Sequence, residues 1–475
     1  MANGTEASAS PGLRRVKMRL FTVVVVIFTL TCGGTFGMED VVGSSGPGLT
    51  LILLLLIPIF WALPMALVSA ELGSALPEEG GFYRWSRRAL GEFWGFQAGW
   101  WWQLSLFVDT SVYIALTGDY FKSTFGITSL ERWLIGAGLI VVFTYINIRG
   151  LDITGWVLTA VEVVVFIPFI ALVIVGLARG HTNPFVPFSV PGQSIFTSAG
   201  AGLAVLMWMF SGYESMSMVA GEIEQPQKLI PKALLINMAL VISFYFLTTM
   251  AGIIGYGHWD QWATGGGSSV DFIVVGKAVG GQVLRYGLIA AMLAGNLGLF
   301  TGYLATGSRP AYVLSKDRMF ARWWSKEHKK FGTPWVAILF MAGLDCLLII
   351  GSFSFLIVID VFCLMFSYMV IMVSAVVLRK KEPGLNRLYK IPLNTWGLAL
   401  FITPPIAIAI YALVSNGWSY FAAGCLAVLS GPLAYLLFKR IYGGVRIRDA
   451  ERTELAEPAV ELTSVPAAAA PIREA

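Results

Sequence analysis

The sequence predicts an all-α polytopic membrane protein, and three observations support that prediction. Of the 475 residues, 56% are hydrophobic and 13% are charged, whereas a soluble domain carries about 25% charged residues. The apolar residues gather in runs of roughly 20, the length that crosses about 30 Å of hydrocarbon as a helix. Lys and Arg concentrate in alternate connecting segments, which is typical of the cytoplasmic loops of membrane proteins.

Twelve transmembrane helices are expected, joined by loops that are rich in Gly, Pro or charged residues. Their expected ranges are 20–45, 48–76, 92–120, 128–147, 153–178, 196–222, 230–257, 280–306, 334–352, 354–378, 396–415 and 418–439. The first range follows a basic segment without a small-residue cleavage site, so it is expected to remain as a helix. The tails, residues 1–13 and 450–475, are rich in Ala, Glu, Pro and Ser and are expected to be disordered.

The distribution of basic residues predicts the orientation of the chain. With the N-terminus inside, most of the 33 Lys and Arg residues lie in cytoplasmic segments. Because translocation of Lys and Arg is disfavoured, both termini are expected in the cytoplasm. The basic run 309–330 is expected to be an amphipathic cytoplasmic loop on the inner leaflet, where anionic lipid attracts it. The net charge of +5 is interpreted as an orientation signal, and no nucleic-acid partner is expected.

The first expected helix contains an interruption in the stretch TLTCGGTFGMED, residues 29–40. Each interior Gly costs a helix roughly 1 kcal/mol relative to Ala, and a carboxylate in hydrocarbon costs a few kcal/mol. An unwound turn survives at membrane depth only where it lines a polar cavity, so this break is predicted to form a substrate site. The residues that mark it are Gly33, Gly34, Thr35 and Gly37, followed by Glu39 and Asp40.

The sixth expected helix has a matching interruption, FSGYES, which contains Gly212 and Glu214. One Gly cluster in a membrane helix more often marks a packing face, but two clusters in equivalent places favour a binding site. Helices 1 and 6 enter the membrane from opposite sides. The pattern therefore predicts two five-helix repeats of inverted topology, residues 14–190 and 191–380, followed by helices 11 and 12 within residues 381–449.

Unwound turns also suit a zwitterionic or cationic substrate. The N–H groups at the start of a half-helix favour an anionic group such as a carboxylate, because the helix dipole is positive there. The carbonyl groups that end the preceding half-helix favour an ammonium group. Glycine lets the backbone approach the ligand and adopt the dihedral angles that the turn requires.

Four stretches resemble the amino acid–polyamine–organocation superfamily of secondary transporters, closest to its polyamine and L-type amino-acid branch. They are GGTFGMEDVVGSSGP, ALVSAELGSALPEEGGFYRWSRRALGEFWGFQAGW, SGYESMSMVAGEIEQPQKLIPKAL and GSRPAYVLSKDRMF, in that order. The resemblance implies twelve helices in an inverted repeat, a substrate held between helices 1, 3, 6 and 8, and proton coupling. Helix 8, NLGLFTGYLATGSR, departs from this branch because it lacks the acidic residues that its polyamine transporters carry there.

Acidic residues at membrane depth usually mark ion or substrate paths. By this resemblance, Glu214 is expected to carry the coupling proton, because a dry site disfavours its charged form. Asp109, in helix 3, is expected to receive an ammonium or guanidinium group. Glu162, in helix 5, lies where related carriers place a substitute for a sodium site, and it is the second candidate for the proton. The alternative for Glu214 is a cap on freed N–H groups, that for Asp109 is a hydrogen bond to a neighbouring helix, and that for Glu162 is a pair with a neighbouring polar group.

Further aromatic and charged residues are candidates for roles at or near the predicted site. Trp208 and Tyr213 flank the second break and are expected to stack on a bound amine. Glu39 and Asp40 either cap the half-helix or gather cations in the external vestibule. The arginines of YRWSRRALG belong to a cytoplasmic gate or simply anchor the chain at the inner leaflet; they are Arg84, Arg87 and Arg88.

Nothing in the sequence indicates catalysis, a cofactor or a metal. The four Cys residues fall within expected helices without metal-site spacing, and the three His residues lie in or beside loops. The chain also has no Gly-rich phosphate loop and no nucleophile elbow. An enzyme is therefore not expected.

These features predict a secondary transporter of amino acids or polyamines in the plasma membrane, working by proton-coupled symport. Its expected partners are the small-molecule substrate, protons and the lipid bilayer. An exchanger on the same fold is the alternative, and a non-transporting sensor and a channel are weaker ones. No obligate protein partner is expected, because no extracellular Cys is available to bridge to one.

Overall fold

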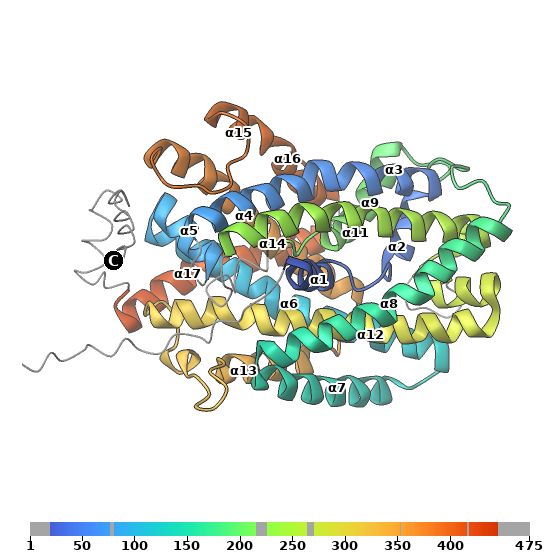
Figure 1. The fold of residues 1–475 in the computed structure, drawn as a ribbon, viewed down its shortest axis with the longest axis horizontal. Coiled ribbons are helices and arrows are strands. Elements are labelled where there is room, and N and C mark those ends of the chain that lie inside the picture. Colours follow the sequence, from blue (N-terminus) through green and yellow to red (C-terminus); the bar gives the residue numbers. More distant parts are fainter. Residues whose placement is uncertain are drawn as a thin grey trace, which may run out of the picture.

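Figure 1 shows a computed structural model of the chain, which describes residues 20–76, 80–214, 226–263, 270–351, 353–415 and 418–444. The described residues are almost entirely helical, apart from connecting segments and one isolated bridge between Trp262 and Val270. The two tails that were expected to be disordered lie outside the described residues.

Each of the twelve expected ranges contains helix, interrupted at residues 32–37 of the first and ending at Met209 in the sixth, whose residues 215–222 lie outside the described part. In chain order they are α1 (Leu20–Thr31) with α2 (Met38–Ser45), α3 (Pro47–Ile57) with α4 (Leu63–Ala75), α6 (Glu92–Phe125), α7 (Ser129–Arg149), α8 (Leu151–Arg179), α9 (Ile195–Met209), α11 (Pro226–Tyr256), α12 (Phe272–Lys316), α13 (Trp335–Leu348), α14 (Phe353–Lys381), α15 (Thr395–Phe401) with α16 (Thr403–Ser415), and α17 (Trp418–Tyr442). A short helix, α5 (Gly81–Leu90), precedes α6. The predicted all-α polytopic fold is confirmed.

Length and composition support membrane crossing for most of these helices. Within the described residues, eight spans are long and apolar enough to cross a bilayer, and α1, α9 and α13 are shorter apolar helices. Large apolar side chains are exposed along α7, α8 and α17, among them Val141, Ile167 and Leu433. Exposed apolar surface of this extent is suited to hydrocarbon rather than water.

The first helix is discontinuous at the predicted place. α1 ends at Thr31 and α2 begins at Met38, so the six residues between them are not helical. Gly34 and Gly37 have φ angles of 105° and 94°, which L-residues with a side chain rarely adopt. Figure 1 places α1 near the middle of the bundle, where it contacts α8, α11 and α12.

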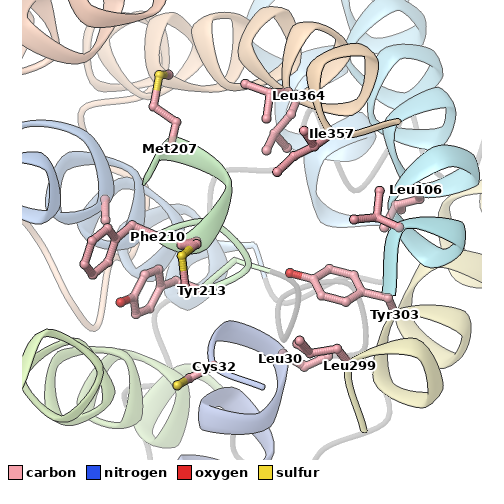
Figure 2. Packing of buried hydrophobic residues seen from close by; sticks show 14 of the residues in the cluster. Leu30, Cys32, Leu106, Met207, Phe210, Tyr213, Leu299, Tyr303, Ile357 and Leu364 are labelled. Atoms are coloured by element: carbon pink, nitrogen blue, oxygen red, sulfur yellow. The ribbon is translucent and has the colours of Figure 1, made fainter. Parts of the chain in front are cut away.

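The second break begins where α9 ends. The chain leaves the helix after Met209, passes through Gly212 with a φ of 99°, and remains non-helical to Glu214. A Cβ atom on Gly212 would collide with the carbonyl oxygen of Leu30 and the hydroxyl of Tyr303. The end of α1 and the second break therefore touch. Figure 2 shows Tyr303 pointing from α12 toward the turn that carries Tyr213.

Helix α12 is longer than expected at both ends. It begins at Phe272, bends at Gly281 with a φ of 71°, and continues to Lys316. The expectation of a loop from residue 309 is wrong for residues 309–316, because this stretch is helical and Arg309 is buried within the protein. Basic composition alone did not distinguish a buried helix end from a surface loop.

Candidate functional site

A narrow cavity of about 20 Å³ lies at the first break, and we call it the glycine chamber. Gly33 and Gly34 line it together with Asn296 and Tyr303 of α12. Asn296 donates a hydrogen bond from Nδ2 to Thr117 Oγ1 (3.1 Å), which fixes the amide at the chamber wall. Among the described residues, the lining of this chamber contains no carboxylate.

The two glycines face neighbouring helices and rings. A Cβ atom on Gly33 would lie 2.9 Å from the carbonyl oxygen of Gly295, so this glycine allows α12 to approach the break closely. A Cβ atom on Gly34 would lie 2.8 Å from the ring of Phe36 and 3.0 Å from that of Phe169. The glycines therefore allow close packing and the turn itself, in addition to lining the chamber.

A second, narrow cavity of about 10 Å³ lies beside the second break, and we call it the acidic chamber. Three carboxylates from three different spans line it: Asp109 of α6, Glu214 of the second break and Asp360 of α14. Gly212 lines the same chamber. The sequence predicted Asp109, Gly212 and Glu214 here, but it did not single out Asp360.

Aromatic rings lie between the two chambers. Trp208 and Tyr303 line both of them, and Tyr113 stacks between these two rings with centroid distances of 5.6 Å to Trp208 and 5.7 Å to Tyr303. Ser211 also lines both chambers. The cavities therefore form two compartments that share one aromatic wall, and the stacking of Trp208 on a bound amine stays a prediction.

Asp109 is bound to this aromatic wall. Trp208 donates from Nε1 to Oδ1 at 2.8 Å, and the hydroxyl of Tyr113 donates to Oδ2 at 3.0 Å. Both donors are neutral, so they orient the carboxylate without supplying a counter-charge. A carboxylate held in this way at a cavity wall can still accept hydrogen bonds from a cationic guest, because each oxygen has a second lone pair.

Glu214 is almost fully buried at the second break. The hydroxyl of Tyr368, on α14, donates a hydrogen bond to Glu214 Oε1. The Tyr368 ring is stacked on Trp61 at 5.5 Å, which fixes its position. Tyr368 was not predicted, since a tyrosine within an apolar helix carries no signal of its partner.

Four predicted residues line neither chamber: Thr35, Gly37, Tyr213 and Glu162. Thr35 lies 2.5 Å, hydroxyl to hydroxyl, from Thr248 of α11, which attaches the first break to that helix. Tyr213 is buried next to Phe210, as Figure 2 shows, and its hydroxyl has no partner within the described residues.

Glu162, on α8, is a buried carboxylate close to α1. Neither of its oxygens accepts a hydrogen bond within the described part of the chain. The neighbouring hydroxyl, that of Thr29, donates instead to the Val25 carbonyl at 2.9 Å. An ionised carboxylate without partners is costly in such a place, so this site suits a proton or a bound cation.

Glu39 caps the half-helix, which is the first of its two expected roles. Its Oε2 accepts from the backbone N–H of Gly37 at 2.7 Å, and its Oε1 accepts from Tyr120 and from the backbone N–H of Phe272. Glu39 is fully buried, whereas Asp40 is half-buried. The N-terminal end of α2 is therefore joined to α6 and α12 by one carboxylate.

The arginines of α5 form ion pairs rather than standing alone at the membrane edge. Arg84 and Arg87 lie 3.1 and 2.8 Å from Asp317 Oδ2, which follows the end of α12. Arg88 lies 2.7 Å from Glu382 Oε2, which follows α14. These pairs connect α5 to the C-terminal ends of α12 and α14. They favour the interpretation of these arginines as part of a gate.

The amino-acid sequence is similar to those of known transport proteins. Residues 18–430 match the amino acid permease family. A probable polyamine transporter of Arabidopsis thaliana is 31% identical, covering 91% of this chain and 86% of its own, and a polyamine transporter of Oryza sativa subsp. japonica is also 31% identical, covering 86% and 75%. A serine/threonine exchanger of Bacillus subtilis is 25% identical over 90% of this chain and 98% of its own.

The fold is shared with a solved structure, that of MhsT in complex with L-phenylalanine. The TM-score is 0.58 at 14% identity, and the match covers 90% of this chain and 100% of that one. Family and relatives are transporters, so this chain is a membrane transporter of the amino acid and polyamine class and not an enzyme. It belongs to the amino acid permease family, within the amino acid–polyamine–organocation superfamily and near its polyamine branch.

Proposed function

We propose that this transporter carries organic cations, polyamines first among them, by proton-coupled symport across the plasma membrane. The observation that supports the substrate class is the acidic chamber, where Asp109, Glu214 and Asp360 line one cavity. Three carboxylates so close together cannot all be ionised without cations between them, because like charges and burial both disfavour the charged form. A polyamine supplies several ammonium groups to one such cavity.

The eighth span, α12, lacks the acidic residues that the polyamine branch carries there, but this does not argue against a polyamine as the substrate. The carboxylates of the acidic chamber come from α6, the second break and α14, so three other spans supply the negative charge. Helix 8 contributes Tyr303 to the shared wall and Asn296 to the glycine chamber instead. Relatives named as polyamine transporters, at 31% identity, support the same substrate class.

In the proposed cycle, the substrate enters from outside and places an ammonium group against Asp109. Glu214 takes a proton from the external side, and the Tyr368 hydroxyl donates to the ionised form and keeps it oriented between turnovers. After the transporter reorients, the higher cytoplasmic pH removes the proton and the substrate leaves. Glu162 is the alternative proton carrier, because it is buried without hydrogen-bond partners among the described residues.

The experiment that tests this function uses the purified chain alone in proteoliposomes, since we propose that no other subunit is required. Uptake of labelled putrescine, spermidine, arginine, leucine and alanine is measured with and without an inward proton gradient. We expect the polyamines to accumulate inside the liposomes, and we expect the proton gradient to accelerate their uptake. If no cation is carried, or if leucine and alanine are carried in their place, the proposed substrate class is wrong.

Exchange is a second candidate, because a relative of 25% identity is named a serine/threonine exchanger. The same liposomes distinguish the two modes. Symport requires only the proton gradient, whereas obligate exchange requires substrate inside the liposomes before any label enters. Label that enters only preloaded liposomes would identify the chain as an exchanger.

The proposed orientation, with both termini in the cytoplasm, predicts the accessibility of the segment after α12. Lys326 is exposed at the end of a short helical turn, Arg322–Ser325, and lies in the basic run that follows α12. We expect Lys326→Cys to resist an impermeant thiol reagent on intact cells and to react after the membrane is permeabilised. Labelling on intact cells would reverse the orientation and the assignment of inner and outer faces.

A further inference from the structure

Asp360, on α14, is a carboxylate that is 1% exposed and lines the acidic chamber. Its Oδ1 accepts a hydrogen bond of 2.5 Å from the hydroxyl of Ser105, on α6. A single neutral donor orients this carboxylate but does not balance its charge. A buried carboxylate at membrane depth therefore favours a cationic partner, and the acidic chamber is the cavity that Asp360 lines.

Two polar residues of α6 that line the acidic chamber lie one helical turn apart. Ser105 and Asp109 are four residues apart on this helix, a rise of roughly 6 Å at 1.5 Å per residue. Residues four apart lie on the same helix face, and both line the acidic chamber. Asp360 is hydrogen-bonded to Ser105, so it meets α6 about one helical turn from Asp109. That span is comparable to the separation of two amines on a four-carbon chain.

A second feature of the acidic chamber independently indicates a guest. Trp102 lines this chamber and is 2% exposed, and its buried indole N–H has no acceptor within the described residues. A buried donor without an acceptor costs about 1–3 kcal/mol, so it favours a guest that supplies one. The acceptor would be a carboxylate of the substrate or a water that enters with it.

Resting on the proposed function, we infer that Asp109 and Asp360 form two ammonium subsites one helical turn apart. The chamber then selects dications whose ammonium groups are separated by a four-carbon chain. Diamines and diamino acids share this chemistry. A diamine would bring a water to the Trp102 N–H, and a diamino acid would place its carboxylate there.

The test is a competition series against uptake of labelled putrescine in proteoliposomes. The competitors are diamines with three, four, five and six carbons, butylamine as the singly charged analogue, and ornithine as the diamino acid. For the wild-type chain we expect the four-carbon diamine to compete best and butylamine to compete poorly. Stronger competition by ornithine than by putrescine would assign the subsites to diamino acids, whereas equal competition by all chain lengths would contradict paired subsites.

Substitution of Asp360 separates a selectivity role from a structural one. Asp360→Asn is expected to weaken putrescine roughly 10- to 150-fold, the loss of one charge-assisted contact, while the weak competition by butylamine is unchanged. Asp360→Glu moves the carboxylate one methylene into the chamber, so we expect it to retain binding and shift the preference toward the shorter diamine. A merely structural carboxylate would not move the preferred chain length.

The matched control is Asp345→Asn. Asp345, on α13, is equally buried and accepts from the Thr110 hydroxyl at 2.7 Å, but it does not line the acidic chamber. We expect this variant to keep the wild-type order of competitors. An equal loss for putrescine and butylamine in Asp360→Asn would overturn the inference while leaving polyamine transport intact. Failure of the wild-type chain to carry any cation would instead overturn the proposed function.

Discussion

Glu214→Gln is expected to abolish accumulation driven by an inward proton gradient while preserving substrate binding. Gln has nearly the same shape as the protonated acid and cannot release a proton, so the step that couples transport to pH is removed. Its amide oxygen can still accept a hydrogen bond from the Tyr368 hydroxyl, which keeps the second break in place. Uptake by liposomes with and without the gradient, and counterflow of preloaded substrate, measure the two properties separately.

Glu162→Gln is the matched substitution in helix 5. Glu162 is also buried, but it lines neither chamber, and its oxygens have no hydrogen-bond partner within the described residues. We expect this variant to retain gradient-driven accumulation. If Glu162→Gln loses it and Glu214→Gln keeps it, the coupling proton belongs to helix 5. If both variants keep it, the proton is carried elsewhere.

Gly34→Val is expected to abolish substrate binding and transport without preventing insertion of the chain. Gly34 has a φ of 105°, a conformation that a β-branched residue adopts only with strain of about 1–3 kcal/mol. The added Cβ would also lie 2.8 Å from Phe36 and 3.0 Å from Phe169. The turn must change shape to remove these contacts, and the glycine chamber changes with it.

Binding of labelled putrescine to the purified protein, together with its elution as a monodisperse species, measures the effect of Gly34→Val. Gly138→Val on α7 is the control, because apart from its chain neighbours and the adjacent backbone of its own helix no atom lies within 4 Å of the position of its Cβ, and its φ is not positive. We expect the control to bind as the wild type does. Wild-type binding by Gly34→Val would show that the first break is not part of the site.

The discontinuous helices were predictable because glycine and carboxylates in an apolar run are costly, and only a polar cavity removes that cost. Asp109 and Glu214 line one chamber, as expected for carboxylates that are costly in hydrocarbon and less costly at a polar cavity. Their predicted roles as substrate and proton sites stay predictions, because the arrangement supports them without testing transport. Gly33 was predicted only as part of the substrate site. It also allows α12 to pack closely, because the Gly295 carbonyl of α12 lies against it.

Asp360 and Asp345 carry the same sequence signal as Asp109, an acid within an apolar run, but were not predicted as site residues. Each is a single acid within an apolar run, LIVIDVFCL and MAGLDCLLI, where a charge is expensive. Neither run contains a break or a motif, so no second feature drew attention to them. Which helix they face depends on tertiary packing. Side-chain periodicity along one helix cannot determine that Asp360 meets Ser105 or that Tyr368 meets Glu214.

The central claim is that the substrate occupies the space between the two breaks, and protection of Ser211→Cys tests it most directly. Ser211 lines both chambers, so a Cys there lies beside any substrate that the two chambers hold. In a chain whose four native cysteines are replaced, a small cationic thiol reagent should modify this Cys, and putrescine should slow the reaction. The control, Ser129→Cys, lies in an exposed groove beside Arg132 and should react at the same rate with or without putrescine. If putrescine is transported but gives Ser211→Cys no protection, the substrate does not bind between the breaks.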